Sequence, residues 1–194
     1  SGYRPIMHIL HKPEVIKILL EHGANVDMPD IINQTPLYNA CEVGSEELIK
    51  ILLEYGADVN KFDDYNSTPL WVASEEGHAN IVKILINHNA NVDQLRDNRE
   101  SPIWIASREG HTEIVQILLD NNANINQSNN DGETPLYIAS QEGHEEICKI
   151  LLKSGAKPRI DELISTPVTL LTDFIKPLPL FNACRDGNFE IANN

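Results

Sequence analysis

The stretch TPLWVASEEGH, residues 68–78, is written three more times in the chain with small changes. TPLYNACEVGS begins at Thr35, SPIWIASREGH at Ser101 and TPLYIASQEGH at Thr134, so the interval is 33 residues each time. A fixed period of about 20–50 residues is typical of proteins that stack copies of one small unit. The sequence therefore predicts a repeat architecture with full units at 35–67, 68–100, 101–133 and 134–166.

Each unit is predicted to hold two helices. A hydroxyl residue followed by proline is the chemistry of a helix N-cap with proline at the first helical position. The second helix, EELIKILLEYG in the first full unit, carries one apolar stripe. Both helices are expected to end at residues that tolerate a left-handed backbone. For the first helix these are Gly44, Gly77, Gly110 and Gly143, and for the second Gly23, Gly56, Asn89, Asn122 and Gly155.

These residues resemble the ankyrin repeat family, whose 33-residue period and TPLHxA signature match TPLYNA, TPLWVA, SPIWIA and TPLYIA. The resemblance extends over nearly all of the chain. It implies an all-α repeat solenoid, a stack of units that each contain a helix-turn-helix and a β-turn. The family's histidine is replaced here by Tyr38, Trp71, Trp104 and Tyr137. Since that position supports the hairpin in the family, we expect the same fold with different local contacts.

The two ends depart from the pattern. Residues 1–34 are interpreted as a degenerate N-terminal repeat, because EVIKILLEHGANVD fits a second helix whereas RPIMHILHKP lacks TPLxxA. The pattern returns in LPLFNACRDGNFEIA, 11 residues later than the period requires. We expect residues 167–178 to be an insertion, either a spacer or a dedicated site, and residues 179–194 to begin a further repeat. Neither end carries the polar outer face that closes a solenoid, which predicts a fragment of a longer protein. We expect this fragment to be monomeric.

Charge and cysteine content limit the function classes. The net charge of -14, from 29 acidic and 15 basic residues, opposes binding to nucleic acid or to anionic membranes and favours basic or neutral partners. The sequence holds no stretch of the ~18 apolar residues that span a membrane. Three cysteines without a CxxC spacing argue against a disulfide framework or a zinc ribbon. We expect a cytoplasmic protein, with the nucleus as the alternative.

Motifs for catalysis or metal binding are missing from the sequence. There is no GxSxG, no GxxxxGK[ST] and no GxGxxG after a strand, and HEEIC at 144–148 lacks the second histidine of HExxH. His78, His111 and His144 recur once per unit, but neighbouring helices lie roughly 8–10 Å apart, too far to share one metal ion. Cys41 and Cys184 fill a slot that serine fills in the other units, and both are expected to be inert. We expect no enzyme activity, no metal and no cofactor.

Residues that vary between units are the candidates for binding. In ankyrin-like stacks the turns and the inner side of the first helices form an extended concave surface. Acidic residues at the end of the first helix are interpreted either as a docking surface for a basic peptide or as a solvated face. The aromatic column is interpreted either as an interface or as packing between units. The candidate partner-binding residues are Tyr38, Glu42, Phe62, Tyr65, Trp71, Glu75, Glu76, Leu95, Trp104, Arg108, Glu109, Tyr137 and Glu142.

The function that follows is a non-enzymatic scaffold that binds a basic or mixed-charge peptide, or a partner domain, on its concave face. An alternative hypothesis is a targeting or regulatory arm of a larger enzyme or channel whose chemistry lies outside this fragment. A third, binding of a small phosphorylated ligand, is opposed by the charge of -14.

Overall fold

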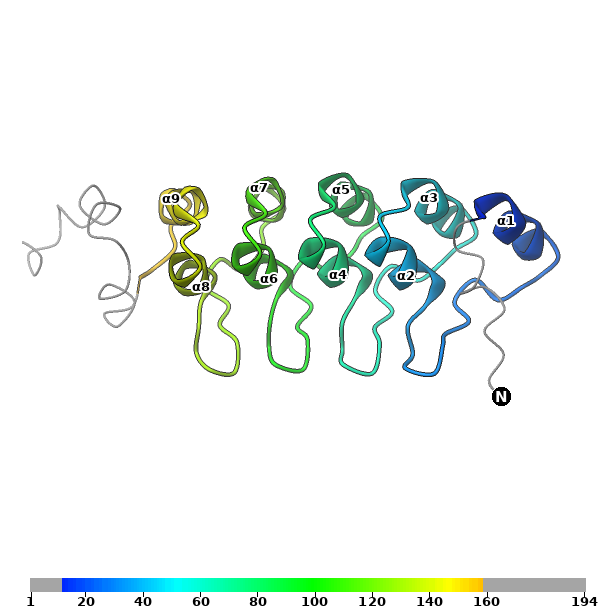
Figure 1. Cartoon of the computed structure of the whole chain (residues 1–194), viewed down its shortest axis with the longest axis horizontal. Helices are drawn as coiled ribbons and strands as arrows, with labels where there is room; N and C mark the ends of the chain where they lie inside the picture. The colour runs from blue at the N-terminus through cyan, green and yellow to red at the C-terminus, as the bar shows by residue number, and fades with distance from the viewer. Residues whose placement is uncertain (1–11, 159–194) are drawn as a thin grey trace, which may run out of the picture.

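A computed structural model describes residues 12–158. Over this range the chain forms nine helices and no strand (Figure 1). The helices are α1 (Pro13–Glu21), α2 (Pro36–Glu42), α3 (Glu46–Glu54), α4 (Pro69–Glu75), α5 (Ala79–Asn87), α6 (Pro102–Arg108), α7 (Thr112–Asp120), α8 (Pro135–Gln141) and α9 (Glu145–Lys153). The predicted all-α repeat solenoid is confirmed. The predicted insertion at 167–178 and the partial repeat at 179–194 lie outside the described residues.

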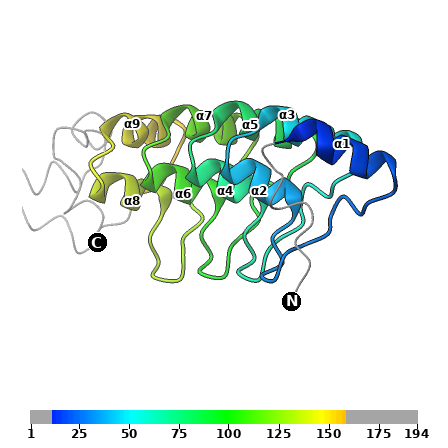
Figure 2. The ribbon, with the colours of Figure 1, turned by 45° about the vertical axis from the view of Figure 1, so that its right-hand side comes forward.

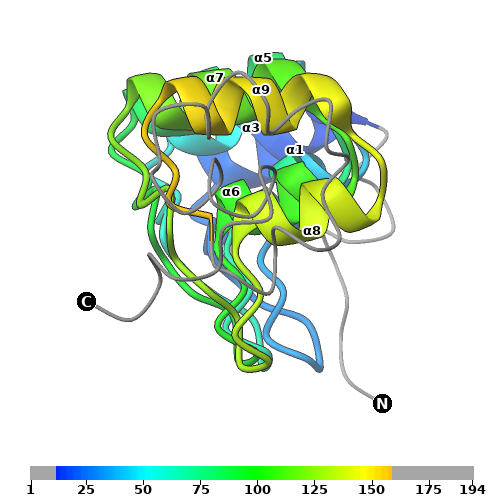
Figure 3. The same cartoon turned by 90° about the vertical axis from the view of Figure 1, so that its left-hand side faces the viewer.

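The helices form two rows, and extended hairpins project from one of them. The first helices of the units, α2, α4, α6 and α8, lie side by side in the row next to the hairpins, and α1, α3, α5, α7 and α9 form the second row (Figures 1 and 2). Each first helix contacts its own second helix and the first helices of the neighbouring units. A view along the stack superposes the units, with the hairpins extending to one side of the helices (Figure 3).

Every first helix begins at the predicted cap. The side-chain oxygens of Thr35, Thr68, Ser101 and Thr134 each accept a hydrogen bond from the backbone N–H three residues further on, and proline follows each cap. In α4, for example, Thr68 Oγ1 lies 3.2 Å from the Trp71 nitrogen. Because the first N–H groups of a helix have no partner within the helix, this cap satisfies one of them while proline removes another.

The predicted helix ends are confirmed as well. The backbone φ is positive at Gly23, Gly44, Gly56, Gly77, Asn89, Gly110, Asn122, Gly143 and Gly155. At Gly77 a second constraint acts, since a Cβ on this residue would lie 2.6 Å from Cε1 of His111 in the next unit. The same ring donates a hydrogen bond through Nε2 to the carbonyl oxygen of Glu75 at 2.9 Å. The recurring histidine therefore fixes one unit against the previous one.

One hydrophobic core runs through the stack. Its fully buried side chains come from both rows and recur at the repeat interval; among them are Leu37, Leu48, Leu70, Ile81, Ile103, Ile114 and Leu118. A two-helix unit alone cannot cover these side chains on both sides, so its neighbours must bury them. Stacking is thus the source of stability in this fold.

Hydrogen bonds also link successive hairpins. The last residue of each extended segment (ANVD, ADVN, ANVD and ANIN) accepts a hydrogen bond through its side chain from a backbone N–H in the following unit. These residues are Asp27, Asn60, Asp93 and Asn126. At the hairpin tips, the N–H of Asp64 donates to the carbonyl oxygen of Ile32, and Asp97 and Asn130 repeat this contact one and two units later. The hairpins therefore form a connected row beside the first helices.

Candidate functional site

The aromatic column lies inside the stack. Tyr38, Trp71 and Trp104 are only 6%, 2% and 3% exposed, whereas Tyr137 is half-buried. Trp104 Nε1 donates a hydrogen bond to the carbonyl oxygen of Glu133 in the next unit, at 3.1 Å. We therefore correct the prediction for the first three rings: they pack between adjacent units and have almost no surface to offer a partner. Tyr137 keeps a partly accessible ring.

The remaining candidates lie on one surface, which we call the inner face. It consists of the last turns of α2, α4, α6 and α8 together with the hairpins that precede these helices. Phe62 and Tyr65 on one hairpin are each 51% exposed, and Leu95 on the next is half-buried. Glu42, Glu76, Glu109 and Glu142 are exposed, while Glu75 and Arg108 are half-buried. The acidic residues thus recur along the stack at solvent-accessible positions.

Arg108 joins neighbouring parts of the inner face. Its guanidinium group pairs with Glu109 at 2.7 Å and lies 4.0 Å from a carboxylate oxygen of Glu75 in the preceding unit. The guanidinium carbon lies 5.5 Å from the centroid of the Trp104 ring. A predicted contact residue therefore holds two acids together, and the indole beneath it contributes a cation–π interaction.

A second cation, Arg96, was missed by the sequence analysis. It belongs to the hairpin between α5 and α6, and its guanidinium carbon lies 4.6 Å from the centroid of Trp71 and 5.9 Å from that of Tyr65. Its Nη1 lies 3.6 Å from Oε2 of Glu100. Aligning the units would have found this residue, because Asp30, Asp63 and Asn129 occupy the equivalent position.

The inner face is electrostatically crowded around Glu75. Burial is the main cause that raises the pKa of this carboxyl above its ordinary value, and the charges of Glu76 and Glu109 raise it further. Arg96 and Arg108 act in the opposite direction without reversing the shift. Burial also raises the pKa of Tyr38, and the negative charges of Asp63, Glu42 and Glu75 add to this effect. The Tyr38 hydroxyl therefore stays protonated beside these acids.

Replacing Glu75 by glutamine is expected to stabilise the protein near pH 7. Because the folded-state pKa of Glu75 is raised above 4.5, its ionised form costs stability at any pH above that folded-state value. The wild-type protein regains this stability as the pH falls through the raised pKa toward 4.5. Urea midpoints of both proteins between pH 7.5 and 4 would measure the effect. A difference that grows toward acid pH would contradict it.

Two cysteines of the described residues are buried. Cys41 in α2 and Cys148 in α9 are buried and unpaired among the described residues. Burial raises the pKa of the Cys41 thiol well above its usual range and that of Cys148 to about 11. Since the thiolate is the nucleophilic form, burial and the raised pKa support the expectation that Cys41 is inert. Cys184 lies outside the described residues.

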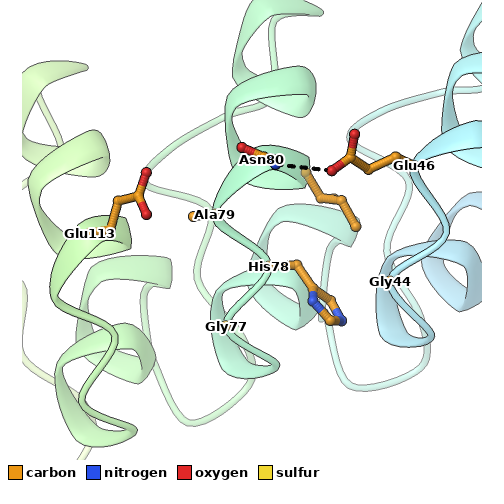
Figure 4. A pocket seen from close by; sticks show the side chains of 8 residues that line it. Gly44, Glu46, Gly77, His78, Ala79, Asn80 and Glu113 are labelled. Atoms are coloured by element: carbon orange, nitrogen blue, oxygen red, sulfur yellow. Dashed lines mark hydrogen bonds between the residues drawn. The ribbon is translucent and has the colours of Figure 1, made fainter.

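Polar side chains near the turns between paired helices form hydrogen bonds and ion pairs with one another. A pocket of about 280 Å³ lies between the starts of α3, α5 and α7, and in it the ring of His78 points toward Gly44 (Figure 4). Asn80 Nδ2 donates to Glu46 Oε1 at 3.1 Å, and Lys83 pairs with Glu113 at 2.7 Å. These contacts link neighbouring units, and they explain the polar residues there as structural.

The described residues provide no metal site. Between residues 12 and 158 no group of three or more His, Cys, Asp or Glu side chains is arranged to hold a metal ion. Within the same range, none of the helices has the length and apolar character needed to cross a membrane.

The structure is that of a helical repeat protein of the interaction-module class. It has paired helices, hairpins linked at their tips, and an accessible inner face. The family model for ankyrin repeats (3 copies) matches residues 6–96 and again 70–162. The chain belongs to the ankyrin repeat family, whose members are typically protein–protein interaction modules and not enzymes. Comparison with curated proteins finds no match.

Proposed function

We propose that this chain is a non-enzymatic scaffold that binds a basic or mixed-charge peptide, or a partner domain, on its inner face. The observation that carries the proposal is the row of exposed carboxylates at Glu42, Glu76, Glu109 and Glu142. Apart from Glu109, which pairs with Arg108, none of them forms an ion pair with a described residue. Like charges repeated along one surface attract and orient a cationic partner.

Apolar side chains beside the acids support the same proposal. Phe62 and Tyr65 expose half of their surface on a hairpin, and Val43 is 61% exposed at the end of α2. Aromatic residues are frequent anchors of protein interfaces, because they bury a large area with little loss of side-chain freedom. A specific interface buries roughly 1,200–2,000 Å² in total, which requires contact with several units of the inner face.

The double variant Glu76→Lys/Glu109→Lys is expected to weaken binding of an inner-face peptide at least about tenfold, because two attractive charges become repulsive. Peptides for this measurement can be selected from a random peptide display library on the wild-type protein and synthesised with a fluorescent label. Anisotropy titrations then compare the two proteins, and circular dichroism checks that helicity is unchanged.

A matched control separates the inner face from net charge alone. The variant Glu47→Lys/Glu54→Lys changes the charge by the same amount on α3, in the second row, where neither acid forms an ion pair with a described residue. It is expected to change the affinity less than about threefold through weak long-range effects. If both double variants weaken binding equally, or neither does, the assignment of the inner face is wrong.

A further inference from the structure

The hairpin between α5 and α6 lacks a feature that the other described hairpins share. In those hairpins, Oδ1 of Asp30, Asp63 or Asn129 accepts hydrogen bonds from the backbone N–H groups two and four residues further on, at 2.8–3.0 Å. The equivalent residue is Arg96, whose side chain can only donate. No described side chain accepts from the N–H groups of Asn98 and Glu100. This turn is therefore less well supported.

The tip of the same hairpin departs from the pattern a second time. Asn33, Asn66 and Gly132 occupy a left-handed backbone position, which these residue types tolerate, but here Arg99 occupies it with φ 60°. The Asn33 and Asn66 side chains also bond to Asp64 and Asp97 on the next tip, a link for which Arg99 has no equivalent. A sequence that breaks local rules at one site commonly does so for function.

Arg96 has a well-defined environment on the inner face. Its guanidinium group lies over the rings of Trp71 and Tyr65, and its side chain is 31% exposed. None of its side-chain N–H groups forms a hydrogen bond with a described residue; its one ion pair, to Glu100, is long at 3.6 Å. Two buried atoms close to it, Trp71 Nε1 and Glu100 Oε2, also lack a hydrogen-bond partner among the described residues. The aromatic rings thus position a cation whose donors remain available.

We propose that Arg96 is a specificity-determining residue of the inner face and binds a carboxylate of the partner. A guanidinium group offers paired N–H donors that match a carboxylate, and stacking on two rings reduces the freedom lost on binding. Glu75, which interacts electrostatically with Arg96, and the Glu76 and Glu109 carboxylates near Glu75 disfavour a more highly charged phosphate. The inference rests on the proposed function and refines it: the partner carries an Asp or Glu side chain flanked by basic residues.

The test compares two variants, each of which removes one positive charge from the same hairpin, at positions three residues apart. Arg96→Asn restores the turn acceptor found at Asn129, and Arg99→Asn restores the residue found at Asn33 and Asn66. With peptides selected on the wild-type protein, Arg96→Asn is expected to weaken binding about tenfold, and Arg99→Asn less than twofold. Because Arg96→Asn removes the ion-pair partner of the buried Glu100, its thermal midpoint is expected to fall. Circular dichroism at the titration temperature must therefore show wild-type helicity, so that a loss of binding does not reflect unfolding.

A double-mutant cycle tests the carboxylate directly. Changing the acidic residue of a selected peptide to its amide is expected to weaken binding about tenfold on the wild-type protein and to have no effect on Arg96→Asn. Arg96→Glu should in turn prefer the peptide in which that acid is replaced by lysine. If the loss of affinity from Arg96→Asn and the loss from the peptide amide are additive, the assignment of Arg96 is overturned. A phosphoserine peptide that binds more tightly than the Glu peptide would also overturn it.

The outcomes separate this inference from the proposed function. If the selected peptides depend on Glu76 and Glu109 but need no acidic residue, the inner face is the binding site and the role of Arg96 is wrong. If no peptide is enriched, or if binding is indifferent to Glu76→Lys/Glu109→Lys, the proposed function fails and the inference fails with it.

Discussion

Gly110→Ala is expected to lower the free energy of unfolding by about 2–3 kcal/mol. At φ 81° an alanine enters the left-handed region, which costs roughly 1–2 kcal/mol for a residue with a Cβ. The added Cβ would also lie 2.6 Å from Cε1 of His144, so this ring must move. The movement breaks the hydrogen bond from His144 Nε2 to the carbonyl oxygen of Arg108, with a further loss of about 1 kcal/mol.

Gly143→Ala provides the matched control. Gly143 has nearly the same backbone, φ 79°, but apart from its chain neighbours no described atom lies within 4 Å of the position of its Cβ. Only the backbone cost should remain, roughly 1–2 kcal/mol, as in the first term for Gly110→Ala. Urea denaturation followed by circular dichroism gives both values. Equal losses in the two variants would show that the histidine ring does not restrict the glycine.

Trp104→Ala is expected to lower the free energy of unfolding by about 3–5 kcal/mol, the usual range for deleting a buried aromatic ring. The ring is 3% exposed in α6, between neighbouring units. Because each unit of a solenoid is stabilised by its neighbours, a cavity at this position weakens the stack on both sides. Urea denaturation can be followed by circular dichroism and by the fluorescence of Trp71, the remaining tryptophan. Two separate transitions would show that the stack divides at the cavity.

Phenylalanine substitutions separate the ring from its N–H group. Trp104 Nε1 donates to the carbonyl oxygen of Glu133, whereas Trp71 Nε1 has no partner among the described residues. Trp104→Phe should therefore cost about 1 kcal/mol more than Trp71→Phe. If Trp104→Ala leaves the stability unchanged but abolishes peptide binding, Trp104 contacts the partner directly and our correction of its role is wrong.

Much of the local structure follows from short stretches of sequence. The caps at Thr68 and Ser101 and the ends at Gly77 and Asn89 were predictable, because each depends on the conformational preferences of one or two residues. The repeat interval then placed Glu76 and Glu109 at the ends of first helices and Phe62 and Tyr65 on a hairpin, and these residues are indeed exposed.

By itself the sequence determined the helical units, their boundaries and their stacking, because these depend on local backbone requirements repeated every 33 residues. It could not determine which side chains the stacking covers. Trp71 and Trp104 have a polar edge and suit either a core or an interface, and only the neighbouring unit decided that they are buried. The same packing brought Arg96 over Trp71, although the two residues lie in different parts of the unit. Accessibility and long-range contacts arise from tertiary structure, since they depend on residues distant in the chain.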